Sequence, residues 1–561
     1  MASRYWVGGD GTWDNASTTN WSATSGGAAG ASAPTTADDA IFDSASGTGT
    51  CTVAATAACR DTTVNSSTLV LSYGANCTLT RNLILTLGTI NVNGNTITAA
   101  AFSSTNSNVR AVNFGTNGKF ICSSATAPWN TGTATNLTIS GTGTLDCTDN
   151  TAGTRSILFG TLAESSTINV NVLAGTGTVG LTGSVKNLDF TGFAGTLSNG
   201  ARTIYGNLIV SSGMTCTAGT SATTFAATSG TQQITTNANA TIDFPITFNG
   251  VGGTFQLQDN LTIGSTRTVT LTNGTLDLNS KTVSCGIFSS SNSNTRSIAF
   301  GTGNITLTGS GATIWNTSTV TGLTYTGTPV VNATYAGSTG TRTLSCGTAG
   351  AVPAATCASF NISAGTDAIS GLDNVNNLDF TGFAGTWNQR ARYIYGNLTV
   401  AAGITSGFSS GVCTFAATSG TKTITTNNLT LGFPITFNGI GGTWSFADAL
   451  TQDSTYAFTI TNGTVKLKAG ATSTVGAFAT SGSNQKYLQS TTAGSQATLS
   501  QASGTVNASY LTIKDINATG GAIWNAYRSL GNIDAGNNTG WDFLSTPVTT
   551  TTLAMRLGFG L

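Results

Sequence analysis

The chain has 561 residues, of which only 7% are charged; 21 Lys or Arg and 21 Asp or Glu give a formal net charge of zero, and histidine is absent. Soluble proteins average about 25% charged residues, so the polar surface must consist mainly of hydroxyl and amide groups. The lack of basic clusters argues against nucleic acid as a partner. The lack of histidine excludes imidazole acid–base catalysis and Ser-His-Asp triads.

The sequence contains no apolar run approaching the roughly 18 residues that a membrane helix needs. Its first residues, MASRYWVGGDG, lack the basic start and the apolar stretch of a secretory signal. We therefore expect no membrane insertion, and a protein that stays in the cytoplasm where it is made or leaves it by lysis or a dedicated route.

The N-terminal region, residues 1–78, is predicted to be a cap and attachment region. Trp6, Trp13 and Trp21 stand close together in a Gly- and Asn-rich setting. An open end of a stacked repeat must be blocked against edge-to-edge association, so we expect these bulky side chains to cover the first coil.

The densest group of carboxylates in this region is Asp38, Asp39 and Asp43, with Asp10 and Asp14 upstream. Neighbouring residues of a strand point to opposite faces, so the first two should diverge. We interpret these residues as strand-end caps or turn formers, with a calcium ligand set as the alternative.

A long-period duplication occupies the middle of the chain. The segment NLDFTGFAGTL at Asn187 returns as NLDFTGFAGTW at Asn377, 190 positions later, and FPITFNGVGGTF at Phe244 returns as FPITFNGIGGTW at Phe433, 189 positions later. A third, partial copy extends the repeat, which runs from about residue 83 to residue 485. We predict a repetitive body over residues 79–505.

The body is composed of short alternating runs such as TINVNG, TLDLNS and NITLTG, separated by Gly, Asn and Ser. This two-residue period indicates strands with one buried face, and the turn spacing predicts coils of roughly 20 to 25 residues. Stacked coils would place Thr on Thr and Asn on Asn. The pattern therefore predicts an all-β, elongated right-handed parallel β-helix with distinct terminal caps. Tandem β-sandwich modules are the alternative.

The C-terminal region, residues 506–561, is predicted to be a second cap, with Trp524 and Trp541, followed by an apolar tail that ends in LAMRLGFGL. We predict that one terminal segment, either Met1 to about Asp43 or Thr549 to Leu561, docks into a partner.

Ten cysteines are spread along the chain without a CxxC pair. With no histidine to complete a zinc site, the sequence predicts no metal site, and no cofactor is expected. Most of the cysteines lie in strand-like runs, so we expect free buried thiols that fill the core, with disulfides as the alternative.

A family resemblance supports the fold prediction. The opening RYWVGGDGTWDNASTTNWS resembles the start of β-helical surface and virion proteins, including Trp-rich repeats of bacterial autotransporter passengers. The closing YLTIKDINATGG…NIDAGNNTGWDF and the duplicated block are similar to segments of bacteriophage tail-fibre-like structural proteins. The resemblance implies a phage or surface fibre located on the virion surface, or alternatively on a bacterial cell surface.

Two function classes compete with a plain scaffold. A glycan-degrading tail spike would need two carboxylates roughly 5 to 9 Å apart, whereas Asp189 and Asp379 supply one per copy and are interpreted as ladder positions. A bacterial surface adhesin is the other alternative. We predict a non-enzymatic structural component of a phage virion that binds other virion proteins. It is expected to form a homo-oligomer, with a trimer as one arrangement.

The two long copies differ at a few positions that suggest a contact surface. Trp387 replaces a leucine, Arg390 a glycine and Tyr393 a threonine, while Arg392 is kept from the first copy. Aromatic rings that stack on sugars and a cation that donates hydrogen bonds are typical of carbohydrate sites. These four residues are the predicted glycan- or receptor-binding patch, with ordinary packing or a subunit interface as the alternative.

Overall fold

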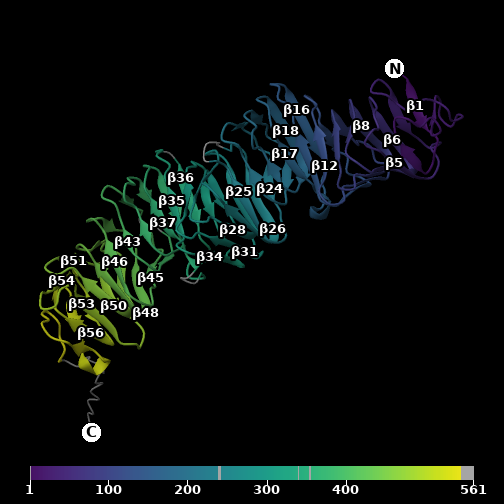
Figure 1. The fold of residues 1–561 in the computed structure, drawn as a ribbon. Helices are drawn as coiled ribbons and strands as arrows, with labels where there is room; N and C mark the ends of the chain where they lie inside the picture. The colour runs from purple at the N-terminus through teal and green to yellow at the C-terminus, as the bar shows by residue number, and fades with distance from the viewer. Residues whose placement is uncertain are drawn as a thin grey trace, which may run out of the picture. The chain divides into compact units, whose positions relative to one another are not determined.

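A computed structural model describes residues 2–237, 242–338, 340–352, 356–388, 390–407 and 409–544. The chain forms two compact units, Met1–Gly309 with Thr319–Pro329 (unit 1) and Ser310–Ser318 with Val330–Leu561 (unit 2). Both consist of parallel strands stacked turn upon turn (Figure 1), in a β-solenoid of about 22 turns. The predicted all-β parallel β-helix is confirmed. The sandwich alternative is wrong, because its strands would pair antiparallel.

Helical structure is nearly absent from the described part of the chain. Two single turns of 3₁₀-helix, η1 (Glu164–Ser166) and η3 (Arg528–Leu530), lie entirely within it. Among the same residues, no helix has the length and apolar character needed to span a membrane.

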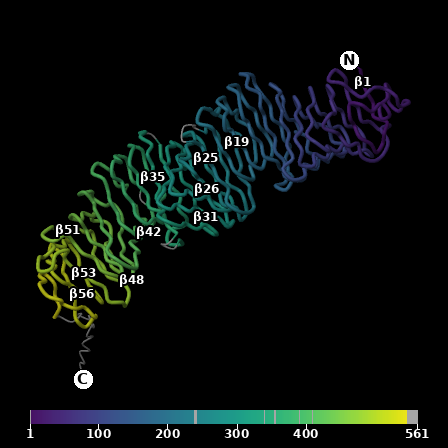
Figure 2. Tube along the Cα trace, in the orientation of Figure 1, coloured from purple at the N-terminus to yellow at the C-terminus, as the bar shows by residue number. Residues whose placement is uncertain are grey.

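The length of a turn is variable. Val170 of β17 (Asn169–Val172) pairs with Leu188 of β19 (Leu188–Asp189), which closes a short turn. Phe102 of β10 (Ala101–Ser103) pairs with Trp129 of β13 (Trp129–Thr131), and this turn is one and a half times as long as the turn from Val170 to Leu188. The predicted coil length of roughly 20 to 25 residues lies between these two cases. Figure 2 shows that within each unit the neighbouring rungs are also neighbours in the sequence, as expected for a solenoid.

Three long strands mark equivalent turns of the repeat: β6 (Thr62–Tyr73), β26 (Ile246–Leu257) and β48 (Ile435–Phe446). Their twelve positions follow one identical pattern of burial and exposure. Each pairs in parallel, with a register shift near its middle, with the next long strand, β8 (Asn82–Asn91), β28 (Thr268–Asp277) or β50 (Ala457–Leu467).

The strand β6 lies before residue 83, so the third copy begins inside the region predicted as the N-terminal cap. Sequence comparison missed it because the inward residues changed identity: Val64 and Leu71 stand where β26 has Phe248 and Phe255. Parallel pairing also continues across the other predicted boundary, from β54 (Ala497–Ser500) to β57 (Ile516–Thr519).

The two ends of the described chain carry aromatic clusters. Trp6, Trp13 and Trp21 are fully buried and pack around Phe42, with ring centroids 5.7 to 5.9 Å from it. Here β1 (Ser3–Trp6) pairs antiparallel with β3 (Trp21–Ser22) and parallel with β4 (Asp39–Phe42). The reversed strand brings a third indole into the first turn and fills its core.

At the C-terminal end, Trp524 and Trp541 pack edge to face at 4.9 Å and both contact Phe478. The tail from Thr549 to Leu561, one of the two predicted docking segments, lies outside the described residues.

Cationic side chains are buried inside the turns, where a solenoid core is expected to be apolar. The seven whose exposed fraction is 3% or less are Arg110, Arg155, Arg202, Arg296, Arg342, Arg392 and Lys486. They recur with the repeat, since Arg110, Arg296 and Lys486 occupy equivalent positions in the three copies.

Arg110 illustrates how such a charge is held. It donates five hydrogen bonds of 2.7 to 3.0 Å: to the carbonyl oxygens of Asn108, Ser104, Thr133 and Thr135, and to the Ser104 hydroxyl. The guanidinium thereby joins loops of two successive turns, and backbone dipoles replace a carboxylate partner. Burial lowers its pKa.

We expect Arg110→Met to lower the free energy of unfolding by about 3 kcal/mol or more, because four carbonyl oxygens and the buried Ser104 hydroxyl lose a donor while the side-chain stem is kept. Chemical denaturation followed by circular dichroism measures the change. Arg81→Met is the control, since Arg81 has a 56% exposed side chain and a 3.7 Å contact with Asp61, and should change stability by less than about 0.5 kcal/mol. Equal shifts in both variants would contradict the role assigned to Arg110.

Candidate binding surface

Two of the four predicted patch residues, Trp387 and Arg392, are buried inside unit 2. Trp387 ends β41 (Thr386–Trp387), and Arg392 begins β42 (Arg392–Ile394), where alternation places it on the same inward face as the isoleucine. The Arg392 guanidinium carbon lies 4.5 Å from the centroid of the indole. The structure therefore removes this pair from the surface, and the four residues do not form one contact patch.

The other two predicted residues, Arg390 and Tyr393, lie on the outside. The Arg390 side chain is 53% exposed, with its Nε 2.8 Å from Oδ1 of Asp373. The Tyr393 ring centroid is 6.4 Å from that of Tyr395, whose hydroxyl donates to the carbonyl of Val352. An ion pair beside two tyrosine rings is thus what remains of the predicted patch.

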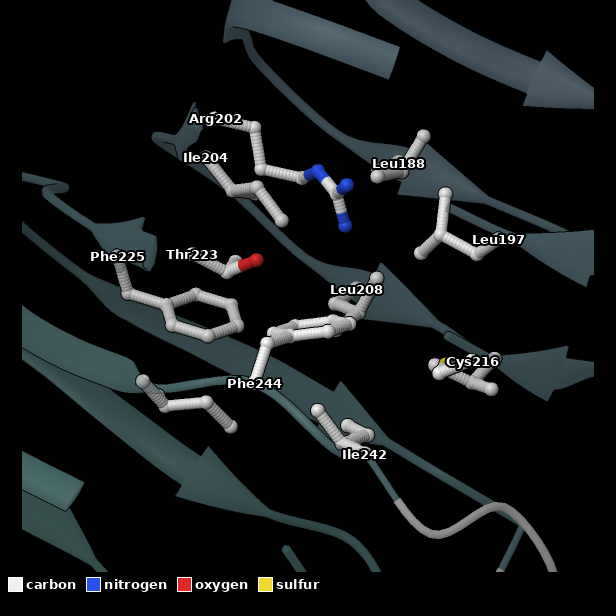
Figure 3. A pocket seen from close by; sticks show the side chains of 12 residues that line it. Leu188, Leu197, Arg202, Ile204, Leu208, Cys216, Thr223, Phe225, Ile242 and Phe244 are labelled. Carbon is white, nitrogen blue, oxygen red and sulfur yellow. The ribbon is translucent and has the colours of Figure 1, made fainter. Parts of the chain in front are cut away.

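Arg392 and its equivalent in the first copy, Arg202, are both buried against an aromatic ring. Burial lowers the pKa of each to about 10, and each guanidinium faces an aromatic ring, that of Trp387 or of Phe244. Figure 3 shows Arg202 pointing among Leu188, Leu197, Leu208 and Phe244. The cavity there measures about 10 Å³, room for about one water molecule, and is therefore too small for an organic ligand.

The N-terminal carboxylates have structural partners, and Asp38 forms a turn with Thr35 as predicted, whereas Asp39 forms an ion pair. Asp38 accepts hydrogen bonds from the backbone of Ala2 and from the hydroxyl of Thr35, and these bonds lower its pKa. Asp39 forms an ion pair with Arg60 at 2.7 Å. Across the part of the chain that the structure covers, no group of three or more His, Cys, Asp or Glu side chains is placed to hold a metal ion.

All ten cysteines are free in the structure, and nine of them are buried, so the prediction of free buried thiols is confirmed. Burial raises the pKa of Cys285 and Cys413 to about 12 and that of Cys77 and Cys216 to about 11. A nucleophilic cysteine needs a lowered pKa, so these thiols are core fillers.

A polar groove of about 280 Å³ runs over four rungs of unit 1, including β15 (Gly143–Cys147), β17, β19 and β22 (Leu208–Ile209). Most of its lining comes from the outward residues of these strands and of the loops that enter them. The lining residues are Thr144, Asn169, Asn171, Asn187, Leu188, Asp189, Asn207 and Ile209.

The amides of the groove are ordered by contacts between rungs. Asn187 Nδ2 donates to Asn169 Oδ1 at 2.7 Å, and Asn187 Oδ1 accepts from the backbone of Asn207 at 2.6 Å. Asn171 Nδ2 donates to Asp146 Oδ1 at 2.7 Å. Each side chain is therefore fixed by the turn before or after it, which gives the groove a preformed array of donors and acceptors.

Sequence analysis did not single out these asparagines as a site, although the signal was present. Asn187 opens the motif NLDFTGF and Asn207 is the third residue of the motif YGNL, and both motifs return in the second copy with Asn377 and Asn397. Their association depends on turn lengths, because only the observed register places residues from successive turns side by side.

We expect iodoacetamide at pH 8 to modify none of the cysteines of the native protein except Cys216, the one cysteine that is not buried. Raised pKa values make the thiolate scarce, and burial blocks the reagent. Mass spectrometry should show at most one adduct on the native chain and ten after unfolding in guanidinium chloride without reductant. Fewer than ten adducts on the unfolded, unreduced chain would reveal disulfides and contradict the assignment.

Comparisons with protein-family models, with curated proteins and with solved structures found no match for this chain. The phage resemblance consequently rests on the sequence motifs.

Proposed function

We propose that the protein is a non-enzymatic structural component of a bacteriophage virion, a fibre or appendage on the particle surface that contributes to adhesion to the host. The parallel β-solenoid is a fold typical of fibres, adhesins and tail spikes. The observation that carries the proposal is that the duplication preserves the contacts between successive turns. The retained features are those that stack one turn on the next, such as Phe225 on Phe248 at 5.4 Å and Phe415 on Phe437 at 5.1 Å.

The chemistry of the carboxylates supports a non-enzymatic role over a glycan-cleaving one. Asp189 and Asp379, the carboxylates repeated in the duplication, each accept a hydrogen bond from a backbone amide two residues later. They act as turn formers at equivalent positions. The buried carboxylate of Asp367 is bound in an ion pair with Arg342 at 2.6 Å.

Mass spectrometry of purified particles tests the proposal most directly, and we expect this chain among the virion proteins. Immunogold labelling should place it on the outside of the particle. Its presence on bacterial envelopes and absence from particles would favour a bacterial surface adhesin. New reducing ends or unsaturated products after incubation with host-surface polysaccharide would favour a glycan-degrading spike.

The expected partners are other virion proteins and further copies of the same chain. Chains lacking residues 2–43 or 549–561 test terminal docking, and we expect one of the two to be lost from particles. The first deletion removes the tryptophan cluster, so its fold must be checked by circular dichroism. Incorporation of both truncated chains at the level of the intact chain would contradict docking through a terminus.

Light scattering tests the homo-oligomer. We expect a mass of at least twice the 56.4 kDa of one chain, because a neutral hydroxyl- and amide-rich surface can associate with itself through hydrogen bonds. A single-chain mass at high concentration would contradict self-association.

A further inference from the structure

The polar groove of unit 1 has an equivalent set of side chains in unit 2. There β37 (Ser359–Ile362), β40 (Leu378–Asp379) and β43 (Leu398–Thr399) pair in the register of β17, β19 and β22. Asn377 Nδ2 donates to Ser359 Oγ at 3.0 Å, and Asn377 Oδ1 accepts from the backbone of Asn397 at 2.8 Å. The duplication has therefore kept the amide array as well as the core.

In each copy the array leaves one donor and one acceptor for a ligand. Asn207 Oδ1 accepts from the backbone of Gln233 and Asp189 Oδ1 from that of Thr191, both at 2.7 Å. Within the described residues, neither Asn207 Nδ2 nor Asp189 Oδ2 has a hydrogen-bond partner, and both side chains line the groove. In the described part of unit 2, Asn397 Nδ2 and Asp379 Oδ2 likewise have no hydrogen-bond partner, while Asn397 Oδ1 accepts from the backbone of Thr423 and Asp379 Oδ1 from that of Thr381.

We propose that the groove of unit 1 and the equivalent amide array of unit 2 bind a neutral, hydroxyl-rich polysaccharide, with Asn187, Asp189 and Asn207 as contact residues in unit 1 and their equivalents Asn377, Asp379 and Asn397 in unit 2. A sugar hydroxyl both donates and accepts, so sugar hydroxyls can bond both to the amide N–H of Asn207 and to the carboxylate oxygen of Asp189, which line the same groove. The inference rests on the adhesive part of the proposed function and names its ligand.

Charge selects the class of polysaccharide. The groove contributes carboxylate charge through Asp189 and no cation, since Lys186 next to it is bound to Glu164 at 2.8 Å. A sulfated or phosphorylated chain would be repelled, whereas neutral hydroxyl groups would not. Successive rungs of a sheet are about 4.8 Å apart, so the ladder offers equivalent contacts along a linear chain.

Pre-organisation favours binding. Because Oδ1 of both Asp189 and Asn207 is already bound to backbone, these side chains lose little rotamer freedom when a ligand arrives. The predicted patch residues Arg390 and Tyr393 belong to different strands and loops of unit 2 and are not needed for this site.

The test measures binding of neutral linear hexasaccharides of glucose, mannose and galactose by titration calorimetry, with a sulfated hexasaccharide as the charge control. We expect at least one neutral probe to bind with two sites per chain. Asp189→Ser with Asn207→Ala should reduce the stoichiometry to one, because serine retains the turn acceptor and removes the second oxygen. Adding Asp379→Ser and Asn397→Ala should weaken binding at least tenfold.

The matched control is Asn273→Ala with Asn462→Ala, which removes ladder amides that donate to Asn249 and Asn438 outside the groove. This variant should bind as the parent does, and thermal melting should show that all variants are folded. Failure of every neutral probe to bind, or unchanged binding by the fourfold variant, would overturn the inference. Detection of the chain in virions without saccharide binding would overturn the inference alone, whereas saccharide binding by a chain absent from virions would overturn the proposed function alone.

Discussion

The structure depends on one constraint, the in-register stacking of each turn on the preceding turn. Parallel main-chain hydrogen bonds align every rung with its neighbours, so that a residue is surrounded by residues about one turn away in the sequence. Inward positions must then be filled by side chains that match those above and below. Phe225 on Phe248 and Phe415 on Phe437 are the same solution to this requirement in the two units.

The buried cations satisfy the same constraint for backbone groups. Where the chain leaves one strand for the next, carbonyl oxygens face inward and need donors. Arg296, like Arg110, donates to carbonyls of two successive turns, including those of Ser290, Thr319 and Thr321. An arginine with five N–H groups can satisfy several of them at once. Lys486 stands at the equivalent position with fewer donors and bonds to Gly482 and Ser509.

The outer surface carries exposed apolar side chains at equivalent positions of the two copies. Val251 and Ile440 are each 67% exposed at equivalent positions of β26 and β48. The adjoining glycines, Gly250 and Gly439, cannot vary, because a Cβ would overlap the carbonyl oxygen of Ala227 or Ala417. Conservation of the groove asparagines on such a surface is informative because packing alone does not require every one of them. At Ser359 the second copy replaces the amide of Asn169 with a hydroxyl and keeps the ladder contact.

The sequence by itself determined the fold class. The two-residue period, the spacing of Gly, Asn and Ser turns and the long-period duplication suffice for a parallel solenoid, because strand alternation and turn formation are local properties. Free, buried cysteines were also predictable, as was the turn-forming role of Asp38. The same alternation predicts Arg392 inside, since it shares a face with Ile394.

Only the tertiary structure decided which residues lie together on the surface. Turn length varies from one rung to the next, so the register that brings Asn169, Asn187 and Asn207 into one line cannot be counted from the sequence. The burial of Trp387 likewise follows from the turns stacked on either side of it. The equivalence of β6 with β26 and β48 is visible only in their shared pattern of burial. Periodicity is a property of neighbouring residues, whereas a site on a solenoid is formed by residues one turn apart, and their alignment is set by every loop between them.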